Sequence, residues 1–308
     1  MRRRTGLMVI TMVVILGSFS AYLVGRSNAS QPKTSSTTTS TPTKLTGFYI
    51  DIGASDSLGF QPTGIVNHNG RRTDTGYAND LLFLEKLKGA ELTLYQIGCP
   101  GETVQTILNP NVADNCYKLP ETQMSNAIRI LQANQSEPGV VSIDLGFNNI
   151  RLCMSPGGVN QACVAAGVAA IGVDMPKIIK DLKAAAGPNV HFVGVDYNDP
   201  FLAFYLDGPN GPAVATQTLD AINSVNTALI TAFNRAGVPV ANVPGMFQTE
   251  DNTEVAVDNV GTMPLNVEKA CELTWMCYPS PFGPDDHPND AGYSFIAQAI
   301  EAELPKSW

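Results

Sequence analysis

The sequence has no internal run of basic residues and few histidines. It carries 19 Lys and Arg against 28 Asp and Glu, a formal net charge of −9. Nucleic-acid affinity needs clustered Lys and Arg, so a nucleic-acid partner is excluded. The three histidines do not stand in His-x-x-x-His or Cys-x-x-Cys spacings, which argues against a zinc site. A dinucleotide-binding glycine pattern is also missing, so we expect neither a metal nor another cofactor.

The N-terminus combines positive charge with a hydrophobic segment. Three arginines within the first four residues precede an apolar run at residues 6–25, the order that export machinery reads. We therefore expect a secreted protein, either after cleavage of residues 1–29 as a signal peptide or with this segment kept as a membrane anchor. Residues 30–46 are rich in Ser, Thr and Pro and should form a disordered linker. One folded domain is expected over residues 47–308.

Six cysteines, an even number, fit an exported protein because disulfide bonds persist outside the cell. Pairing of sequence neighbours is the simplest prediction, since each bond then closes a short loop that would otherwise be mobile. The predicted pairs are Cys99–Cys116, Cys153–Cys163 and Cys271–Cys277.

Short β-rich segments recur along the predicted domain. They are apolar enough to be buried on both faces, which is typical of strands in a parallel sheet. The predicted strands are residues 48–52, 92–97, 140–145, 190–195 and 239–243.

Helical patterns alternate with these strands. Pro176 lies inside one pattern, where it should start or kink the helix. Strict alternation of strand and helix predicts a three-layer α/β/α sandwich around a mostly parallel five-stranded sheet. Apolar residues at helical spacing occupy residues 77–84, 124–131, 171–182, 222–233 and 293–304.

Candidate functional residues lie in loops that follow the predicted strands, and ligands of open parallel sheets bind at this edge. Ser55 follows the first strand at a strand-to-helix turn, where a serine hydroxyl can be exposed near helix amides. Gly101 follows the second strand and Asn148 follows the third. His287 comes just before the last helical pattern.

These four residues, in this order, resemble the conserved blocks of the SGNH or GDSL-type hydrolases. The motifs are GASDS at Ser55, CPGET at Gly101, GFNN at Asn148 and DDHP at His287. Each motif alone is weakly specific, but four in order at predicted strand ends make coincidence improbable. The resemblance covers residues 48–304 and implies the flavodoxin-like sandwich fold of that family.

The resemblance also implies a serine esterase or lipase that needs no cofactor. His287 would take the proton of Ser55, whose oxygen attacks an ester carbonyl to form an acyl-enzyme that water hydrolyses. The Asn148 amide and the backbone N–H groups of Ser55 and Gly101 would form the oxyanion hole. The substrate is expected to be a small-molecule, lipid or acylated-sugar ester, and the sequence does not choose among them.

The sequence departs from the family pattern in three places. Ala54 stands where an aspartate usually precedes the serine, and Asn149 stands where an aspartate usually follows the asparagine. Pro284 occupies the usual position of the acid, three residues before the histidine. We therefore expect Asp285 to orient the imidazole, with Asp286 or a backbone carbonyl as the alternatives.

Simpler roles are open for the same residues. Ser55 could only cap a helix, and Ser57 is a rival nucleophile. His68 and His191 are expected to be structural or exposed. The aromatic segment at residues 197–206 could line an acyl pocket or pack into the core. For the whole chain, the alternatives are a noncatalytic binding domain on the same fold and an acyltransferase.

Overall fold

The folded part of the chain is described by a computed structural model, which covers residues 45–63, 70–109, 116–257 and 261–306. The predicted signal peptide, the possible membrane tether at residues 6–25 and His68 lie outside the described residues. The first strand begins at Leu45, two residues before the predicted start of the domain.

Five strands form the central sheet. They are β1 (Leu45–Gly53), β2 (Ala90–Gln96), β3 (Gly139–Asp144), β6 (Val190–Val195) and β7 (Val240–Ala241). Their order is β2-β1-β3-β6-β7, and every neighbouring pair is parallel. In the register, Ile50 of β1 lies between Tyr95 of β2 and Val141 of β3. The predicted five-stranded parallel sheet is confirmed.

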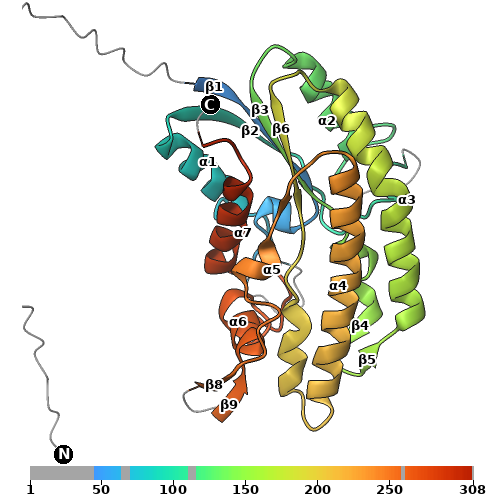
Figure 1. The fold of residues 1–308 in the computed structure, drawn as a ribbon, viewed down its shortest axis with the longest axis vertical. Coiled ribbons are helices and arrows are strands. Elements are labelled where there is room, and N and C mark those ends of the chain that lie inside the picture. The colour runs from blue at the N-terminus through green and yellow to red at the C-terminus, as the bar shows by residue number, and fades with distance from the viewer. Residues whose placement is uncertain (1–44, 64–69, 110–115, 258–260, 307–308) are drawn as a thin grey trace, which may run out of the picture. The chain divides into compact units, whose positions relative to one another are not determined.

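Helices cover both faces of this sheet (Figure 1). They are α1 (Tyr77–Leu87), α2 (Gln123–Ala133), α3 (Gln161–Ala185), α4 (Gly211–Arg235) and α7 (Asp290–Ala302). Helices α1 and α7 pack together on one face, whereas α2, α3 and α4 lie side by side on the other. The predicted three-layer sandwich is therefore confirmed.

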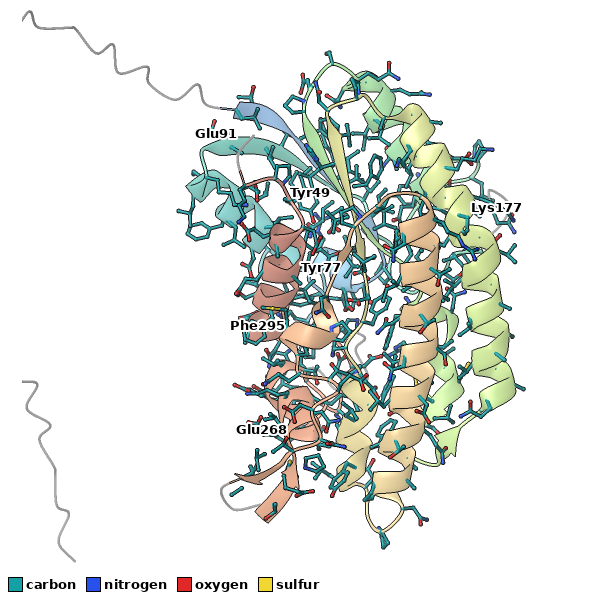
Figure 2. All side chains as sticks on the ribbon, viewed as in Figure 1. Tyr49, Tyr77, Glu91, Lys177, Glu268 and Phe295 are labelled. Carbon is teal, nitrogen blue, oxygen red and sulfur yellow. A yellow bond between two sulfur atoms is a disulfide. The ribbon has the colours of Figure 1, made fainter. Side chains whose placement is uncertain are left out.

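Alternation along β1 shows why both faces need a helical layer. Phe48 and Ile50 belong to the core shared with α2, α3 and α4, whereas Tyr49 belongs to the core shared with α1 and α7. Figure 2 shows Tyr49 and Tyr77 in the interior, and neither ring is exposed. Burying side chains of this size stabilises the fold by about 1.5–3 kcal/mol each.

Helix α3 differs from the prediction at its start. It begins at Gln161, well before Pro176, so the proline does not start the helix. By length and composition, α3 is the one helix in the described part of the chain that could cross a membrane. Ile171, Ile178 and Leu182 on one side of it are fully buried in the core shared with α4. That one-sided burial is how a helix packs in a layered sandwich.

The fifth strand is shorter than predicted, and the reason lies in the residues that follow it. The Asn242 side chain accepts a hydrogen bond from Gly245 N at 3.0 Å and caps the short helix α5 (Val243–Met246). The chain therefore leaves the sheet after Ala241. Other short elements are the strands β4 (Met154–Ser155), β5 (Gly158–Val159), β8 (Glu254–Val257) and β9 (Gly261–Pro264), the helix α6 (Leu265–Leu273), and the 3-10 helices η1 (Asp56–Leu58), η2 (Phe147–Asn149), η3 (Arg151–Cys153) and η4 (Pro200–Leu206).

Disulfide bonds hold the loops at the carboxyl edge of the sheet. One pair fixes the loop after β2, another joins η3 to the start of α3, and the third joins α6 to the loop that precedes α7. The bonds are the neighbour pairs predicted from the sequence, Cys99–Cys116, Cys153–Cys163 and Cys271–Cys277.

Candidate active site

A small pocket beyond the carboxyl ends of the strands brings together Ser55, Asn148 and His287. Ser55 follows the end of β1 after one intervening residue, Asn148 follows β3, and His287 precedes α7. Segments far apart in the sequence therefore meet at the edge where an open parallel sheet binds its ligands. The full lining is Ala54, Ser55, Asp56, Asp144, Phe147, Asn148, Arg151, Tyr197, Asp286 and His287.

The Ser55 hydroxyl is left available by its turn. Ser55 precedes η1, but its side chain makes no capping hydrogen bond to that helix. Its carbonyl accepts the backbone N–H groups of Leu58 and Phe60 at 3.0 and 3.2 Å. Among the residues that the structure describes, the N–H and hydroxyl groups of Ser55 have no hydrogen-bond partner. The turn therefore does not use either group for its own stability, and Ser55 lines the pocket.

Ser57, the rival nucleophile, lies on the inner side of the same turn. Its side chain is fully buried, and its hydroxyl donates to the Ala54 carbonyl at 2.8 Å. The hydroxyl also lies directly against Gly98, where a Cβ atom would be only 1.9 Å from it. The position leaves no path for a substrate, so Ser57 has a structural role.

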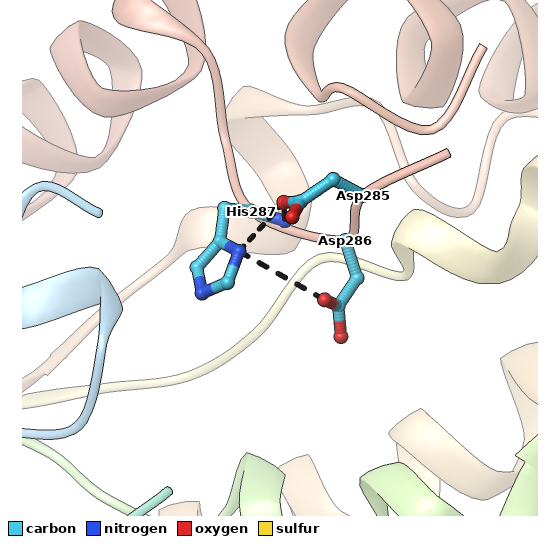
Figure 3. A group of neighbouring side chains, drawn as sticks. All are labelled: Asp285, Asp286 and His287. Atoms are coloured by element: carbon cyan, nitrogen blue, oxygen red, sulfur yellow. Dashed lines mark hydrogen bonds and ion pairs between the residues drawn. The ribbon is translucent and has the colours of Figure 1, made fainter. Parts of the chain in front are cut away.

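The His287 ring is oriented by the residue two positions before it. Its Nδ1 lies 2.6 Å from Asp285 Oδ1, and the same oxygen accepts the His287 backbone N–H at 3.0 Å. An ionised carboxylate can only accept hydrogen bonds, so Nδ1 carries the proton and Nε2 of the neutral ring is an acceptor. Asp286 Oδ1 is farther from Nδ1, at 3.9 Å (Figure 3).

Carboxylates around His287 control its protonation. Burial lowers the pKa of His287, but the hydrogen bond to Asp285 and the charges of Asp56, Asp285 and Asp286 outweigh burial and raise the pKa to about 9. Burial raises the pKa of Asp56 to about 7, because it disfavours the charged carboxylate, although the positive charge of His287 acts in the opposite direction. For Asp285, burial is outweighed by the hydrogen bond and charge of His287, and the pKa is lowered. The carboxylates around the ring therefore favour its protonated form in the free site.

Two of the three predicted oxyanion-hole residues, Gly101 and Asn148, lie on adjoining loops. The Asn148 side-chain amide donates to the Glu102 carbonyl at 3.2 Å, which places the Asn148 turn beside Gly101. Gly101 is exposed, has a φ of +83° that favours glycine, and has open space where a side chain would start. It does not itself line the pocket. In the described part of the chain its backbone N–H donates to no acceptor.

Gln123 connects the serine turn to this loop, and the sequence analysis missed it. Its fully buried side chain accepts from Gly53 N at 2.8 Å and donates to Gly53 O at 2.9 Å. The same Nε2 donates to Glu102 Oε2 at 3.2 Å. A polar residue at the start of α2 gave no signal for this role, because its partners are distant in the sequence.

Asn149 also holds the loop that carries Gly101, through the residues that follow this glycine. Its Oδ1 accepts the Val104 backbone N–H at 3.2 Å, and its Nδ2 donates to Gln105 Oε1 at 2.6 Å. The asparagine that replaces the usual aspartate therefore fixes the segment after Gly101, which requires both an acceptor and a donor.

The pocket also contains Arg151 and Asp144, which were not assigned from the sequence, and Tyr197, the first residue of the aromatic segment that was expected to line an acyl pocket or pack into the core. Arg151 binds Asp286 through two nitrogens of its guanidinium group, because Nε donates to Oδ2 and Nη2 donates to Oδ1. Asp144 accepts the Tyr77 hydroxyl at 3.1 Å, and burial raises its pKa to about 6. The available signals were weak, since Asp144 only ends a predicted strand and Arg151 only follows Asn148 by three positions.

The remaining candidates divide between core and surface. Phe201 and Phe204 are buried with ring centroids 5.2 Å apart, so most of the aromatic segment packs into the core. Trp275 donates through Nε1 to Gln61 Oε1 at 2.6 Å. This bond connects the loop between α6 and α7, which carries His287 and is called the histidine loop below, to the segment that follows η1 and the Ser55 turn. His191 is exposed on β6.

The histidine loop is also where potential metal ligands cluster. Asp285, Asp286 and His287 place ligand atoms within 4.8 Å of one another. However, Asp285 is hydrogen-bonded to the imidazole, and Asp286 is bound by the Arg151 cation. Both carboxylates are therefore engaged by groups that a cation would have to displace.

Comparisons with known proteins bear on the fold. No family model and no curated protein sequence matches this chain. Crystal structures of phospholipase A1 from Streptomyces albidoflavus NA297 and of an extracellular lipase from Streptomyces rimosus do match it. Each has 15% sequence identity and a TM-score of 0.52, and each covers 84% of this chain and 99% or 100% of its own.

The chain has the SGNH-hydrolase fold. The fold implied by the four sequence motifs is therefore confirmed. At 15% identity the SGNH fold says little about the reaction by itself, because one fold can carry many activities. The function has to be argued from the pocket.

Proposed function

We propose that the protein hydrolyses carboxylic esters through an acyl-enzyme on Ser55, with His287 as general base and Asp285 as the residue that orients it. The observation that carries the proposal is the convergence of Ser55, Asn148 and His287 in one pocket, with Asp285 on the far nitrogen of the ring. A nucleophile, a base and an orienting acid at one site are the parts that acyl transfer needs.

In the proposed reaction, neutral His287 accepts the Ser55 proton at Nε2 while the serine oxygen attacks the ester carbonyl. The developing oxyanion would be met by the backbone N–H groups of Ser55 and Gly101 and by the Asn148 amide. Each such donor typically lowers the barrier by about 2.7–4 kcal/mol. Collapse expels the alcohol, which receives the proton from the imidazole, and water then hydrolyses the acyl-enzyme by the same steps.

We place this activity outside the cell. Three disulfide bonds in one chain favour an oxidising compartment, because thiols are kept reduced in the cytoplasm. An extracellular location also agrees with the charged and hydrophobic segment at the N-terminus. The substrate would then be an ester that reaches the protein from the medium or from a cell surface.

The size of the pocket favours a short acyl group. The free space in it is about 20 Å³, on the order of what a single water-sized group occupies. An acetyl group could be accepted with small side-chain movements, but a fatty acyl chain would need the pocket to open. A larger open groove, of about 720 Å³, is lined by Arg71, Arg72, Thr73, Asp74, Thr75, Asn79, Leu94 and Gln96, none of them a predicted site residue.

The first experiment is therefore a series of chromogenic esters that differ only in acyl length. We expect kcat/KM to be highest for acetyl and to fall by at least about tenfold for octanoyl, since each misfit that costs about 1.4 kcal/mol slows turnover tenfold. Acetylated sugars are included as a second alcohol class. Added alcohol as acceptor reports acyl transfer through the ester product that it forms.

Equal or higher rates on long acyl chains would contradict the short-acyl assignment and leave the esterase assignment standing. A protein inert on every ester, acetylated sugars included, would contradict ester hydrolysis itself and favour a noncatalytic binding domain on the same fold.

The pH profile tests His287 as the base. A base must be neutral to act, so activity is absent below its pKa and appears as the pH rises through it. Because the pKa of His287 is raised to about 9, kcat/KM should increase about tenfold per pH unit through neutrality and level off above about pH 9. The measurement is kcat/KM for a soluble acetyl ester at each pH, corrected for spontaneous hydrolysis. A plateau that already begins near pH 7 would show that the imidazole is neutral there.

A further inference from the structure

Two carboxylates, not one, lie close to Nδ1 of His287. Asp285 Oδ1 is 2.6 Å away and forms the hydrogen bond, while Asp286 Oδ1 is 3.9 Å away (Figure 3). A ring nitrogen with one proton can make one strong hydrogen bond. The distance to Asp286 is short enough for a small side-chain rotation to bring it into competition with Asp285.

Arg151 prevents that rotation. Its Nη2 donates to Asp286 Oδ1 at 2.8 Å, and its Nε donates to Asp286 Oδ2, so both carboxylate oxygens are held. The two-pronged geometry fixes the plane of the carboxylate as well as its position. Arg151 belongs to η3, which follows the Asn148 turn, and Asp286 lies 135 positions later. The pair therefore ties the proposed oxyanion-hole segment to the histidine loop.

Burial makes this partnership necessary. The Asp286 side chain is only 6% exposed, whereas the Arg151 side chain is 41% exposed. A buried carboxylate without its partner is costly and acts strongly on neighbouring charges. Arg151 is the one permanently charged cation among the residues that line the pocket. The other titratable groups that face His287 or share its pocket are Asp56 from η1, Asp144 from β3, Tyr197 after β6 and Asp285 on the same loop.

We propose that Arg151 is a positioning residue for the catalytic base: it holds Asp286 away from Nδ1, so that Asp285 alone orients the imidazole, and it offsets the Asp286 charge. Its catalytic consequence rests on the proposed function. The effect on the ring itself does not, because orientation and protonation of His287 can be observed without any substrate.

The direct test is an NMR titration of the full chain with isotope-labelled histidine. The chain contains only three histidines, so the His287 signal can be assigned with single His68→Gln and His191→Gln variants. Arg151→Gln leaves the Asp286 charge without its cation and should raise the pKa of His287 by about one unit. Asp286→Asn should lower it, and the double variant should return it to the wild-type value or below.

Two further variants separate charge from structure. Arg151→Lys keeps a cation near Asp286 and should leave the pKa of His287 within about half a unit of wild type. Arg235→Gln removes an exposed arginine at the end of α4 and should change nothing. Thermal unfolding of each variant identifies any that fail to fold, and the Arg151→Lys and double variants then carry the test.

The kinetic counterpart uses the same variants on a soluble acetyl ester. Arg151→Gln should reduce kcat/KM about tenfold at neutral pH, and the loss should become smaller above the shifted pKa, where only the effect of the lost orientation remains. Adding Asp286→Asn should restore the neutral-pH rate. A titration of His287 that Arg151→Gln does not move would overturn the inference, as would a rate loss that is equal at every pH. A wild-type protein inert on all esters would instead overturn the proposed function and leave the titration result intact.

Discussion

Replacing Ser55 with alanine should abolish ester hydrolysis and leave the fold unchanged. The hydroxyl makes no hydrogen bond to the described residues, so its removal costs the folded state nothing. Loss of a catalytic serine removes the acyl-enzyme route altogether, and we expect kcat to fall by at least about 10⁴-fold. The measurement is the rate on acetyl esters beside the wild type, with thermal unfolding as the check on the fold.

Ser57→Ala is the matched control, because it removes a hydroxyl two positions away in the same turn. That hydroxyl is buried and satisfied by the Ala54 carbonyl, so its loss should affect stability slightly and turnover less than about tenfold. Inactivity of Ser57→Ala together with activity of Ser55→Ala would transfer the nucleophile to Ser57. Activity in both would remove serine chemistry from the pocket.

The sheet was predictable from the sequence because its strands are buried on both faces. Phe48 and Ile50 pack against one helical layer and Tyr49 packs against the other, so the segment has buried, largely apolar side chains at consecutive positions. The prediction failed where a local interaction competed with the strand: the Asn242 cap turned the end of the fifth segment into α5. One of its two alternatives for Pro176 was also wrong: the proline does not start the helix, because α3 begins well before it, at Gln161.

The candidate site was predictable only in part. Residues that stand in short motifs could be predicted, whereas contacts between residues far apart in the sequence could not. Ser55, Asn148 and His287 stand in short motifs, so their positions could be inferred one at a time. Partnerships such as Gln123 with Gly53 have no local signature, because neither residue type reveals that its partner will fold beside it. Pairs of residues far apart in the sequence, such as Gln123 with Gly53 and Arg151 with Asp286, position the side chains and charges of the pocket.

The charge balance of the pocket explains why the choice of acid matters. Three aspartates, Asp56, Asp285 and Asp286, act on the His287 imidazole, and Arg151 is the arginine that lines the pocket. An additional negative charge near the ring favours its protonated form, which cannot act as a base. A site that uses one aspartate to orient the ring therefore has to hold the neighbouring aspartate in another partnership.

Asp285→Asn should slow turnover by about 10³–10⁴-fold at the optimum pH. The substitution keeps the size of the side chain, but an amide that donates to Nδ1 favours the tautomer with the proton on Nε2, which cannot accept the Ser55 proton. Removing the charge should also lower the pKa of His287, so the rise of kcat/KM should move to lower pH. A lower plateau of kcat/KM would report the lost orientation of the ring, and a rise at lower pH would report the lost charge.

Asp286→Asn supplies the comparison, because it removes an equal charge from the adjacent residue, whose oxygen is 3.9 Å from Nδ1. It should move the rise of kcat/KM to lower pH while keeping the plateau within about tenfold of wild type, since the hydrogen bond to Asp285 remains. The reverse pattern, with a near-normal Asp285→Asn and a severe Asp286→Asn, would assign the orienting role to Asp286. Normal plateaus in both would mean that neither carboxylate orients the ring, and the tautomer would then have to be fixed by a backbone carbonyl.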